Sequence, residues 1–96
     1  MKTTINIDFN LLNAISKIMI DKNSTLSLAE SCTGGFLSTF FTSKSGASKY
    51  FKGSMVTYTN ESKIKLLGIK SDYIDTYGVV SKCVVELMAK NIRKKY

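Results

Sequence analysis

Residues 27–36 (SLAESCTGGF) place an acid, a hydroxyl group, a thiol and two glycines directly after an apolar run that is typical of a strand. Where a strand leads through a glycine-rich turn into a helix, the free main-chain N–H groups at the helix start can bind an anion. Thr33, Gly34 and Gly35 suit that geometry, and their donors could hold a phosphate or an oxyanion formed when Ser31 attacks a carbonyl. The simpler alternative is a tight turn whose hydroxyl groups cap the helix, and the motif by itself favours that alternative.

A second candidate group lies in residues 57–63 (TYTNESK), where Tyr58 is predicted to end a strand and Lys63 to lie in the first turn of a helix. An unperturbed lysine, with a pKa of about 10.4, is a poor base at neutral pH. Burial and the positive end of the helix dipole would both lower the pKa of Lys63 and make the amine a base. Tyr58 could then relay a proton or orient the amine. The alternative is that Tyr58 packs on the sheet and Lys63 is solvated.

Glu30 and the two cysteines are the other reactive candidates near these groups. Glu30 could orient Lys63 or bind a ligand hydroxyl group, and a simple ion pair is an equal alternative. The chain has no histidine, which excludes Ser-His-Asp and Cys-His mechanisms. Cys32 and Cys83 do not have the spacing of metal ligands, so the sequence predicts reduced thiols and no metal site.

The elements that position these residues can be predicted from apolar spacing, caps and turns. A helix is predicted over residues 8–21 from the apolar positions Leu11, Leu12, Ile15, Ile18 and Met19. Strands are expected over 25–29, ending near Glu30, and over 51–59, with helices over 36–41 and 71–76. Gly53 is expected to mark a bulge or a close backbone approach.

Two further helices are predicted from capping residues. Asn60 is expected to cap a helix that Gly68 ends, and Ser81 to cap a last helix. Four residues of the last helix are predicted to face the core, namely Val84, Val85, Met88 and Ile92. The alternation of helices and strands predicts an α/β layered fold.

Length and charge limit the domain count and the partners. Ninety-six residues allow one domain, predicted over 1–96, with a thin core. No apolar run is long enough to span a membrane, and the first ten residues lack the apolar region of a secretion signal, so we expect a cytoplasmic protein with no membrane partner. A formal charge of +7 favours an anionic partner, but no nucleic-acid-binding motif is present, so nucleic acid is not the expected one.

Three blocks of sequence taken together resemble the CinA C-terminal domain family: LAESCTGG, SGASKYFKGSMVTYTNESKIKLLGI and GVVSKCVVELMA. The resemblance implies an amidohydrolase that deamidates nicotinamide mononucleotide without a metal or cofactor. It implies that Ser31 is the nucleophile and that Tyr58 and Lys63 assist it. In the same interpretation, Glu30 and the turn at Thr33, Gly34 and Gly35 contribute to substrate binding.

The resemblance covers about the first three fifths of the family domain, which in other members continues with a glycine-rich T-G-x-A-G-P loop. It therefore implies a truncated three-layer α/β/α sandwich with a small sheet. Because the absent strands would leave an unpaired sheet edge, we expect a homodimer. The alternative function is a non-catalytic nucleotide- or protein-binding module of the competence/damage-inducible type.

Overall fold

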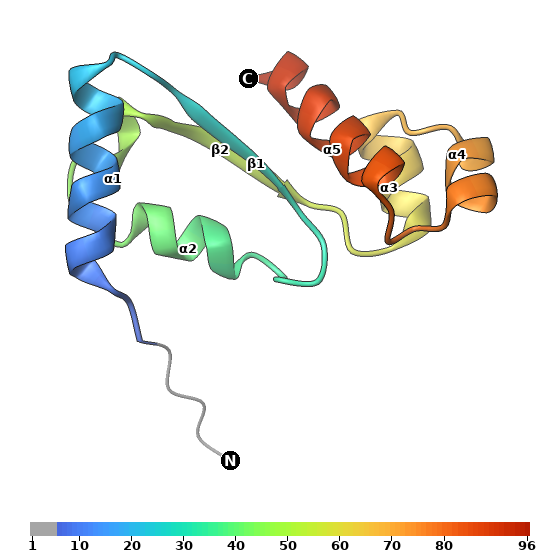
Figure 1. Cartoon of the computed structure of the whole chain (residues 1–96), viewed down its shortest axis with the longest axis horizontal. Helices are drawn as coiled ribbons and strands as arrows, with labels where there is room; N and C mark the ends of the chain where they lie inside the picture. The colour runs from blue at the N-terminus through green and yellow to red at the C-terminus, as the bar shows by residue number, and fades with distance from the viewer. Residues whose placement is uncertain (1–5) are drawn as a thin grey trace.

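A computed structural model describes residues 6–96 and shows an α/β fold with a small sheet (Figure 1). The elements are, in order, α1 (Phe9–Asp21), β1 (Leu26–Glu30), α2 (Phe36–Thr42), the 3₁₀ helix η1 (Ala47–Lys49), β2 (Phe51–Val56), α3 (Asn60–Leu67), α4 (Ser71–Tyr77) and α5 (Lys82–Lys95). Within these described residues, no helix has the length and apolar character needed to cross a bilayer. The expectation about a secretion signal concerns the first ten residues, of which residues 1–5 lie outside the described range.

The sheet consists of the parallel strands β1 and β2. Leu26 pairs with Phe51 but Ser27 pairs with Gly53, so Lys52 is an extra residue that forms a bulge in β2. A Cβ atom added at Gly53 would lie 2.4 Å from the ring of Tyr96. Gly53 therefore marks both the bulge and the close approach expected from the sequence.

Helices lie on both faces of the sheet. Successive residues of a strand point to opposite faces and therefore contact different helices. Ala29 and its partner Met55 pack against the apolar cluster formed by α3, α4 and α5. On the opposite face, the Ser38 hydroxyl group of α2 donates a hydrogen bond to the Glu30 carboxylate and lies 2.7 Å from Ser54 Oγ. The molecule is thus layered as helices, sheet and helix, as expected.

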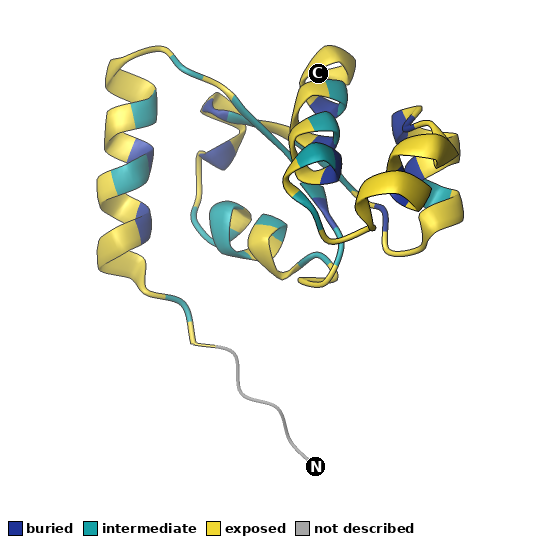
Figure 2. Ribbon diagram, turned by 45° about the vertical axis from the view of Figure 1, so that its right-hand side comes forward, coloured by how far each residue is buried: buried dark blue, intermediate teal, exposed yellow. Residues whose placement is uncertain are grey.

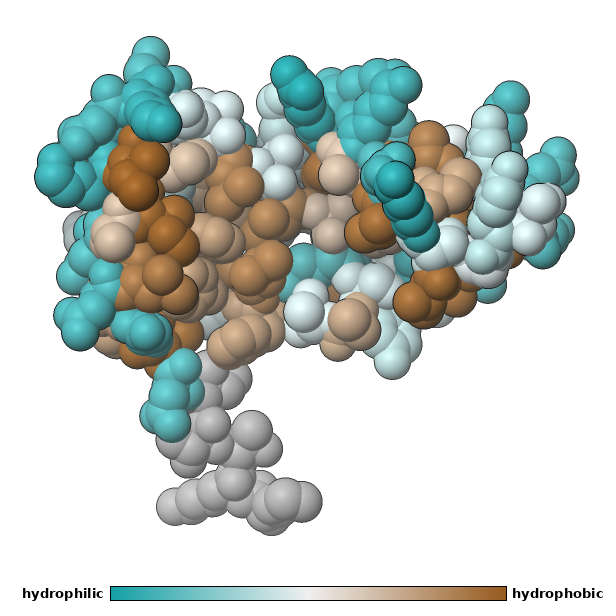
Figure 3. All heavy atoms as spheres, in the orientation of Figure 1, coloured by the Kyte–Doolittle hydropathy of each residue, from teal (hydrophilic) through white to brown (hydrophobic). Residues whose placement is uncertain are grey.

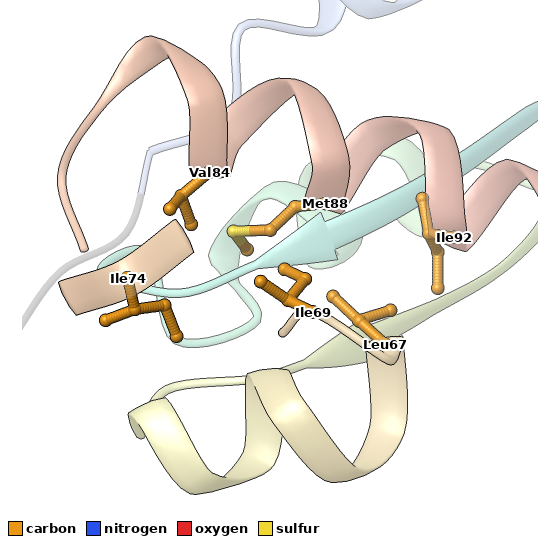
Figure 4. Packing of buried hydrophobic residues seen from close by; sticks show 6 residues of the cluster. All are labelled: Leu67, Ile69, Ile74, Val84, Met88 and Ile92. Carbon is orange, nitrogen blue, oxygen red and sulfur yellow. The ribbon is translucent and has the colours of Figure 1, made fainter. Parts of the chain in front are cut away.

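The main core is a cluster of six buried side chains from the second half of the chain (Figure 4). They are Leu67, Ile69, Ile74, Val84, Met88 and Ile92. A second buried group attaches α1 to the turn before β2: Leu12 and Tyr50 are fully buried, and Lys44 Nζ donates to Ser16 Oγ at 2.9 Å. The two groups lie at opposite ends of the described structure.

Several apolar residues predicted to be buried are exposed (Figure 2). In α1, Leu12 is buried but Leu11 is 51% exposed, and Ile18 is exposed too. In α5, Val85 is 58% exposed and not part of the core. The prediction for Val85 is wrong because Val84, Met88 and Ile92 already form the stripe that faces α3 and α4. Figure 3 shows apolar side chains gathered on the surface over α1 and α2.

The predicted end of the second strand and the predicted cap of α3 also need correction. β2 ends at Val56 and not at residue 59, so Tyr58 lies in the connection to α3. Thr59 is the N-cap, because its side chain accepts a hydrogen bond from the Ser62 N–H at 3.0 Å, whereas Asn60 is the first helical residue. Gly68 and Ser81 cap α3 and α5 as predicted.

Candidate active site

Ser31 and Lys63 meet where the two parallel strands end. Ser31 directly follows β1, and Lys63 is the fourth residue of α3. The Lys63 Nζ atom lies 3.0 Å from Ser31 Oγ, within hydrogen-bond distance. The structure therefore brings together a hydroxyl group and an amine from residues far apart in the sequence, which is the arrangement needed for a nucleophile and its base.

Lys63 is almost completely enclosed, with only 2% of its surface exposed. Besides Ser31 Oγ, its amine contacts the main-chain oxygens of Thr57 at 2.8 Å and of Tyr58 at 3.0 Å. Burial lowers the pKa of Lys63 from its usual value, because an ammonium loses its hydration there. The pKa therefore shifts in the direction that a lysine base requires.

The three neighbours of the Lys63 amine suit both of its protonation states. A charged ammonium has three N–H donors, one for each of the three oxygen atoms. A neutral amine has two donors for the Thr57 and Tyr58 carbonyl groups and a lone pair that can accept the Ser31 hydroxyl proton. A proton can thus pass from Ser31 to Lys63 without movement of the heavy atoms.

The connection between β2 and α3 fixes the position of the amine. The Thr57 N–H donates to the Glu30 carbonyl oxygen at 2.8 Å, which holds this connection against the end of β1. The Thr59 cap then starts α3 so that Lys63 points back toward the two carbonyl groups. The sequence analysis did not single out Thr57 or Thr59. Thr57 contributes through its main chain, which any residue type could provide.

Tyr58 lines the same cleft but differs from the expected arrangement. Its side chain is 67% exposed, and no described residue forms a hydrogen bond with its hydroxyl group. Its main-chain oxygen instead accepts from Lys63 Nζ and, at 3.5 Å, from Ser31 Oγ. Tyr58 orients the amine through its main chain, and a role of the phenol stays a prediction.

Glu30 is directed away from Lys63 and toward the start of α2. Its carboxylate accepts hydrogen bonds from Thr33 Oγ1 at 2.9 Å, from the N–H groups of Leu37 at 2.7 Å and Ser38 at 3.2 Å, and from Ser38 Oγ. Burial alone would raise the pKa of Glu30, but these hydrogen bonds outweigh it and lower the pKa. Glu30 is therefore a buried anion that caps α2, and it forms no ion pair with Lys63.

Thr33, Gly34 and Gly35 form a tight turn, but its hydroxyl groups do not cap α2: Gly35 is the N-cap and makes no side-chain hydrogen bond, and the carboxylate of Glu30 accepts from the helix N–H groups instead. Gly34 and Gly35 have φ angles of 60° and 103°, which favour glycine, and the Gly34 N–H donates to the Ser31 carbonyl group. Thr33 bonds Glu30. Because Glu30 already places a negative charge at the start of α2, this helix end is a poor site for a phosphate.

The N–H groups of Cys32, Thr33 and Gly35 have no acceptor among the described residues, so they can still serve a small oxyanion.

A cleft of about 900 Å³ opens beside Ser31 and Lys63. One wall is apolar and comes from the start of α5 and the loop before it: Val79, Val80, Val85 and Met88. The other wall contains Thr33, Leu37 and Tyr58. The sequence analysis did not assign Val79 and Val80 to the site, because exposed apolar residues before a helix cap resemble ordinary loop residues. The predicted cap at Ser81 did place both valines directly before the last helix. The volume of the cleft is sufficient for a ligand with a flat ring.

Comparison with known proteins agrees with this fold. The family model of the CinA C-terminal domain matches residues 8–96. A CinA-like protein of Flavobacterium psychrophilum is 45% identical over 89 residues, which are 93% of this chain and 21% of that protein. A CinA-like protein of Petrotoga mobilis is 49% identical over 77 residues, 80% of this chain and 19% of that protein. The chain thus spans about a fifth of the length of these relatives.

Among solved structures, a competence-damaged protein (CinA) superfamily protein of Escherichia coli aligns with a TM-score of 0.87 at 30% identity, covering 98% of this chain and 57% of that one. The competence damage-inducible protein A of Klebsiella pneumoniae aligns with a TM-score of 0.89 at 24% identity, covering 94% of this chain and 56% of that one, and shows the shared fold. The family match extends over nearly every described residue. The chain therefore belongs to the CinA C-terminal domain family.

Proposed function

We propose that this chain is an amidohydrolase domain that acts on the carboxamide of nicotinamide mononucleotide, with Ser31 as nucleophile and Lys63 as base. The observation that carries the proposal is the 3.0 Å contact between Ser31 Oγ and an enclosed Lys63 amine of lowered pKa. A serine needs such a partner to attack a carbonyl group, and the chain has no histidine to provide it. The resemblance of the residues around Ser31, Tyr58 and Lys63 to the family motif supplies the substrate class.

In the proposed reaction, Lys63 Nζ accepts the Ser31 hydroxyl proton while Oγ forms a bond to the carboxamide carbon. The unpaired N–H groups of the turn after Ser31 stabilise the oxygen that becomes negative. The C–N bond then breaks, and Lys63 returns its proton to the departing ammonia. Water attacks the acyl-serine ester, with Lys63 again as base, and releases the nucleotide acid and free Ser31.

The apolar wall of the cleft supports a pyridine ring as the group presented to Ser31. Val79, Val80 and Met88 offer side chains that can contact a flat ring. Because Glu30 occupies the start of α2, we expect the nucleotide phosphate to bind lysine side chains at the cleft rim, such as the exposed Lys82, and not the turn at Gly34.

The test measures ammonia and nicotinic acid mononucleotide released from nicotinamide mononucleotide by the wild type and by Ser31→Ala and Lys63→Met. Both substitutions are expected to abolish release to below a hundredth of the wild-type rate. Cys32→Ala, next to the nucleophile and also in the lining of the cleft, is the matched control and should retain activity. Binding of the nucleotide without any release of ammonia by the wild type would contradict the proposal and favour a non-catalytic binding module.

A further inference from the structure

Tyr58 is the only aromatic residue among the described residues that line the cleft beside Ser31. It is 67% exposed, and its hydroxyl group has no hydrogen-bond partner among the described residues. Its main-chain oxygen, in contrast, accepts from Lys63 Nζ at 3.0 Å. The residue is thus anchored through its backbone, while its ring remains available to a ligand in the cleft.

The apolar wall of the cleft provides a second surface for a flat ring. Val79 and Val80 are 37% and 95% exposed, so both keep apolar surface that a bound ring can cover. A ring held between these valines and Tyr58 would have aliphatic groups on one face and an aromatic group on the other. Such an arrangement suits a planar, weakly hydrated ring, and the charge of that ring decides how strongly the aromatic side binds it.

The pyridine ring of nicotinamide mononucleotide is positively charged, because its nitrogen atom is bonded to the ribose. The cleft offers little opposite charge to such a ring: the chain has a formal charge of +7, and Lys63 and Lys82 belong to the lining. Glu30 is the only acidic residue among the described residues of the lining, and its carboxylate is already bonded to Thr33 and to the start of α2. A cationic ring therefore finds no free carboxylate there.

A carboxylate in contact with the ring would also conflict with a lysine base. It would favour the charged form of Lys63 and raise its pKa, whereas burial lowers that pKa. The face of an aromatic ring attracts a cation through its quadrupole and carries no net charge. An aromatic residue is therefore the type of side chain that can bind a cationic ring beside a neutral lysine.

We propose that the ring of Tyr58 determines specificity by binding the positively charged pyridine ring of the substrate in a cation–π interaction, in preference to an uncharged ring of the same size. The inference rests on the proposed function for the identity of the ligand, and it concerns binding, not the chemical step. It assigns the two charges of the nucleotide to different parts of the cleft: the ring to Tyr58 and the phosphate to the rim at Lys82.

The test compares nicotinamide mononucleotide with its reduced form, which has the same ribose and phosphate but an uncharged ring. Calorimetric titrations use Ser31→Ala, so that neither ligand is consumed, and this variant is expected to bind the charged ring roughly tenfold more tightly. Adding Tyr58→Leu should remove most of this preference, whereas adding Tyr58→Phe, which keeps the ring, should retain it. Tyr73→Leu, at an exposed position of α4 outside the lining of the cleft, is the matched control and should leave the preference unchanged.

Three results would overturn the proposal: no preference in Ser31→Ala, the same preference after Tyr58→Leu, or loss of the preference after Tyr58→Phe. If Tyr58→Leu does not fold, NMR of Ser31→Ala takes its place. The ring protons of Tyr58 should then shift on addition of nicotinamide mononucleotide while those of Tyr73 do not, and unshifted Tyr58 signals would overturn the proposal.

Ammonia release by the wild type separates this inference from the proposed reaction. Release of ammonia without a preference that depends on Tyr58 would refute the inference and leave the reaction standing. A preference that depends on Tyr58 without release of ammonia would support the inference and refute the reaction.

Discussion

At the scale of single residues, the main feature is a lysine that is enclosed without a carboxylate partner. Lys63 has only uncharged oxygen atoms within hydrogen-bond distance, so no negative charge there offsets the lost hydration of its charged form. Glu30 directly precedes Ser31, but its carboxylate accepts hydrogen bonds at the start of α2 and not from Lys63. The separation of these two charges is what leaves the amine free to act as a base.

The first prediction is that Ser31 reacts with a fluorophosphonate, a reagent that labels activated serines. The rate of labelling should rise with pH by up to about tenfold per unit until Lys63 has lost its proton, below its ordinary pKa. Mass spectrometry of the labelled peptide measures it. Lys63→Met should lower the rate at least a hundredfold, whereas Ser62→Ala, one residue away and directed to Thr59, should not. Equal labelling of wild type and Lys63→Met would contradict the role of Lys63.

The second prediction concerns the pH dependence of stability. Because the pKa of Lys63 is lower in the folded than in the unfolded chain, the unfolded chain binds the proton more readily, and stability must rise with pH. Between pH 7 and 10 the wild type should therefore gain free energy of unfolding relative to Lys63→Met, by at most about 1.4 kcal/mol per pH unit. Urea denaturation at several pH values measures this gain. The control Lys70→Met, at an exposed position, keeps Lys63, so its free energy of unfolding should rise with pH as that of the wild type does.

At the scale of elements, the ends of helices could be predicted where a local capping residue fixes them. The helices of the second half begin and end close to the predicted residues because Ser81 and Gly68 act on their own neighbours. The end of β2 was missed because the carbonyl groups of Thr57 and Tyr58 turn toward the Lys63 amine, a contact that strand propensity does not contain. The role of Glu30 was missed because its N–H donors, Leu37 and Ser38, belong to the next helix, and this contact too is not contained in local propensity.

The third prediction follows from the four hydrogen bonds that Glu30 accepts. Glu30→Gln should lower the free energy of unfolding by about 1–3 kcal/mol at pH 7, because an amide cannot replace a carboxylate as acceptor for all of them. The pKa of Glu30 is lowered on folding, so this advantage is present above the unfolded pKa and is lost as the pH falls below it through the folded pKa. Denaturation at pH 7 and pH 3 checks both parts. Glu61→Gln, in an exposed pair with Lys65, should change little.

At the scale of the whole molecule, stability is unevenly distributed between the two ends. The six side chains of the main cluster are buried, whereas α1 attaches mainly through Leu12, Ser16 and the Lys44 amine. Cover is poor for Leu11 of α1, which is 51% exposed, whereas Val84 of α5 is fully buried. Val84 belongs to the cluster that α5 forms with α3 and α4.

The fourth prediction is that shortening an apolar side chain to alanine lowers the free energy of unfolding much more in the main cluster than in α1. Ile92→Ala should lower the free energy of unfolding by about 2–5 kcal/mol, because it leaves a cavity in the cluster. Leu11→Ala, with half of the side chain already exposed, should change it by about 0.5 kcal/mol or less. Thermal unfolding of both variants compares them directly. A large loss for Leu11→Ala would mean that α1 is covered in solution, for instance by another chain.

The contribution of α5 to the main cluster has a consequence for the order of folding. Three of the six members of the main cluster, Val84, Met88 and Ile92, belong to α5, and the ring of Tyr96 rests on Gly53. Until α5 is in place, Leu67, Ile69 and Ile74 lack half of their partners in that cluster. Burial of α3 and α4 and docking of α5 are therefore one cooperative step, in which neither side of the cluster is stable without the other.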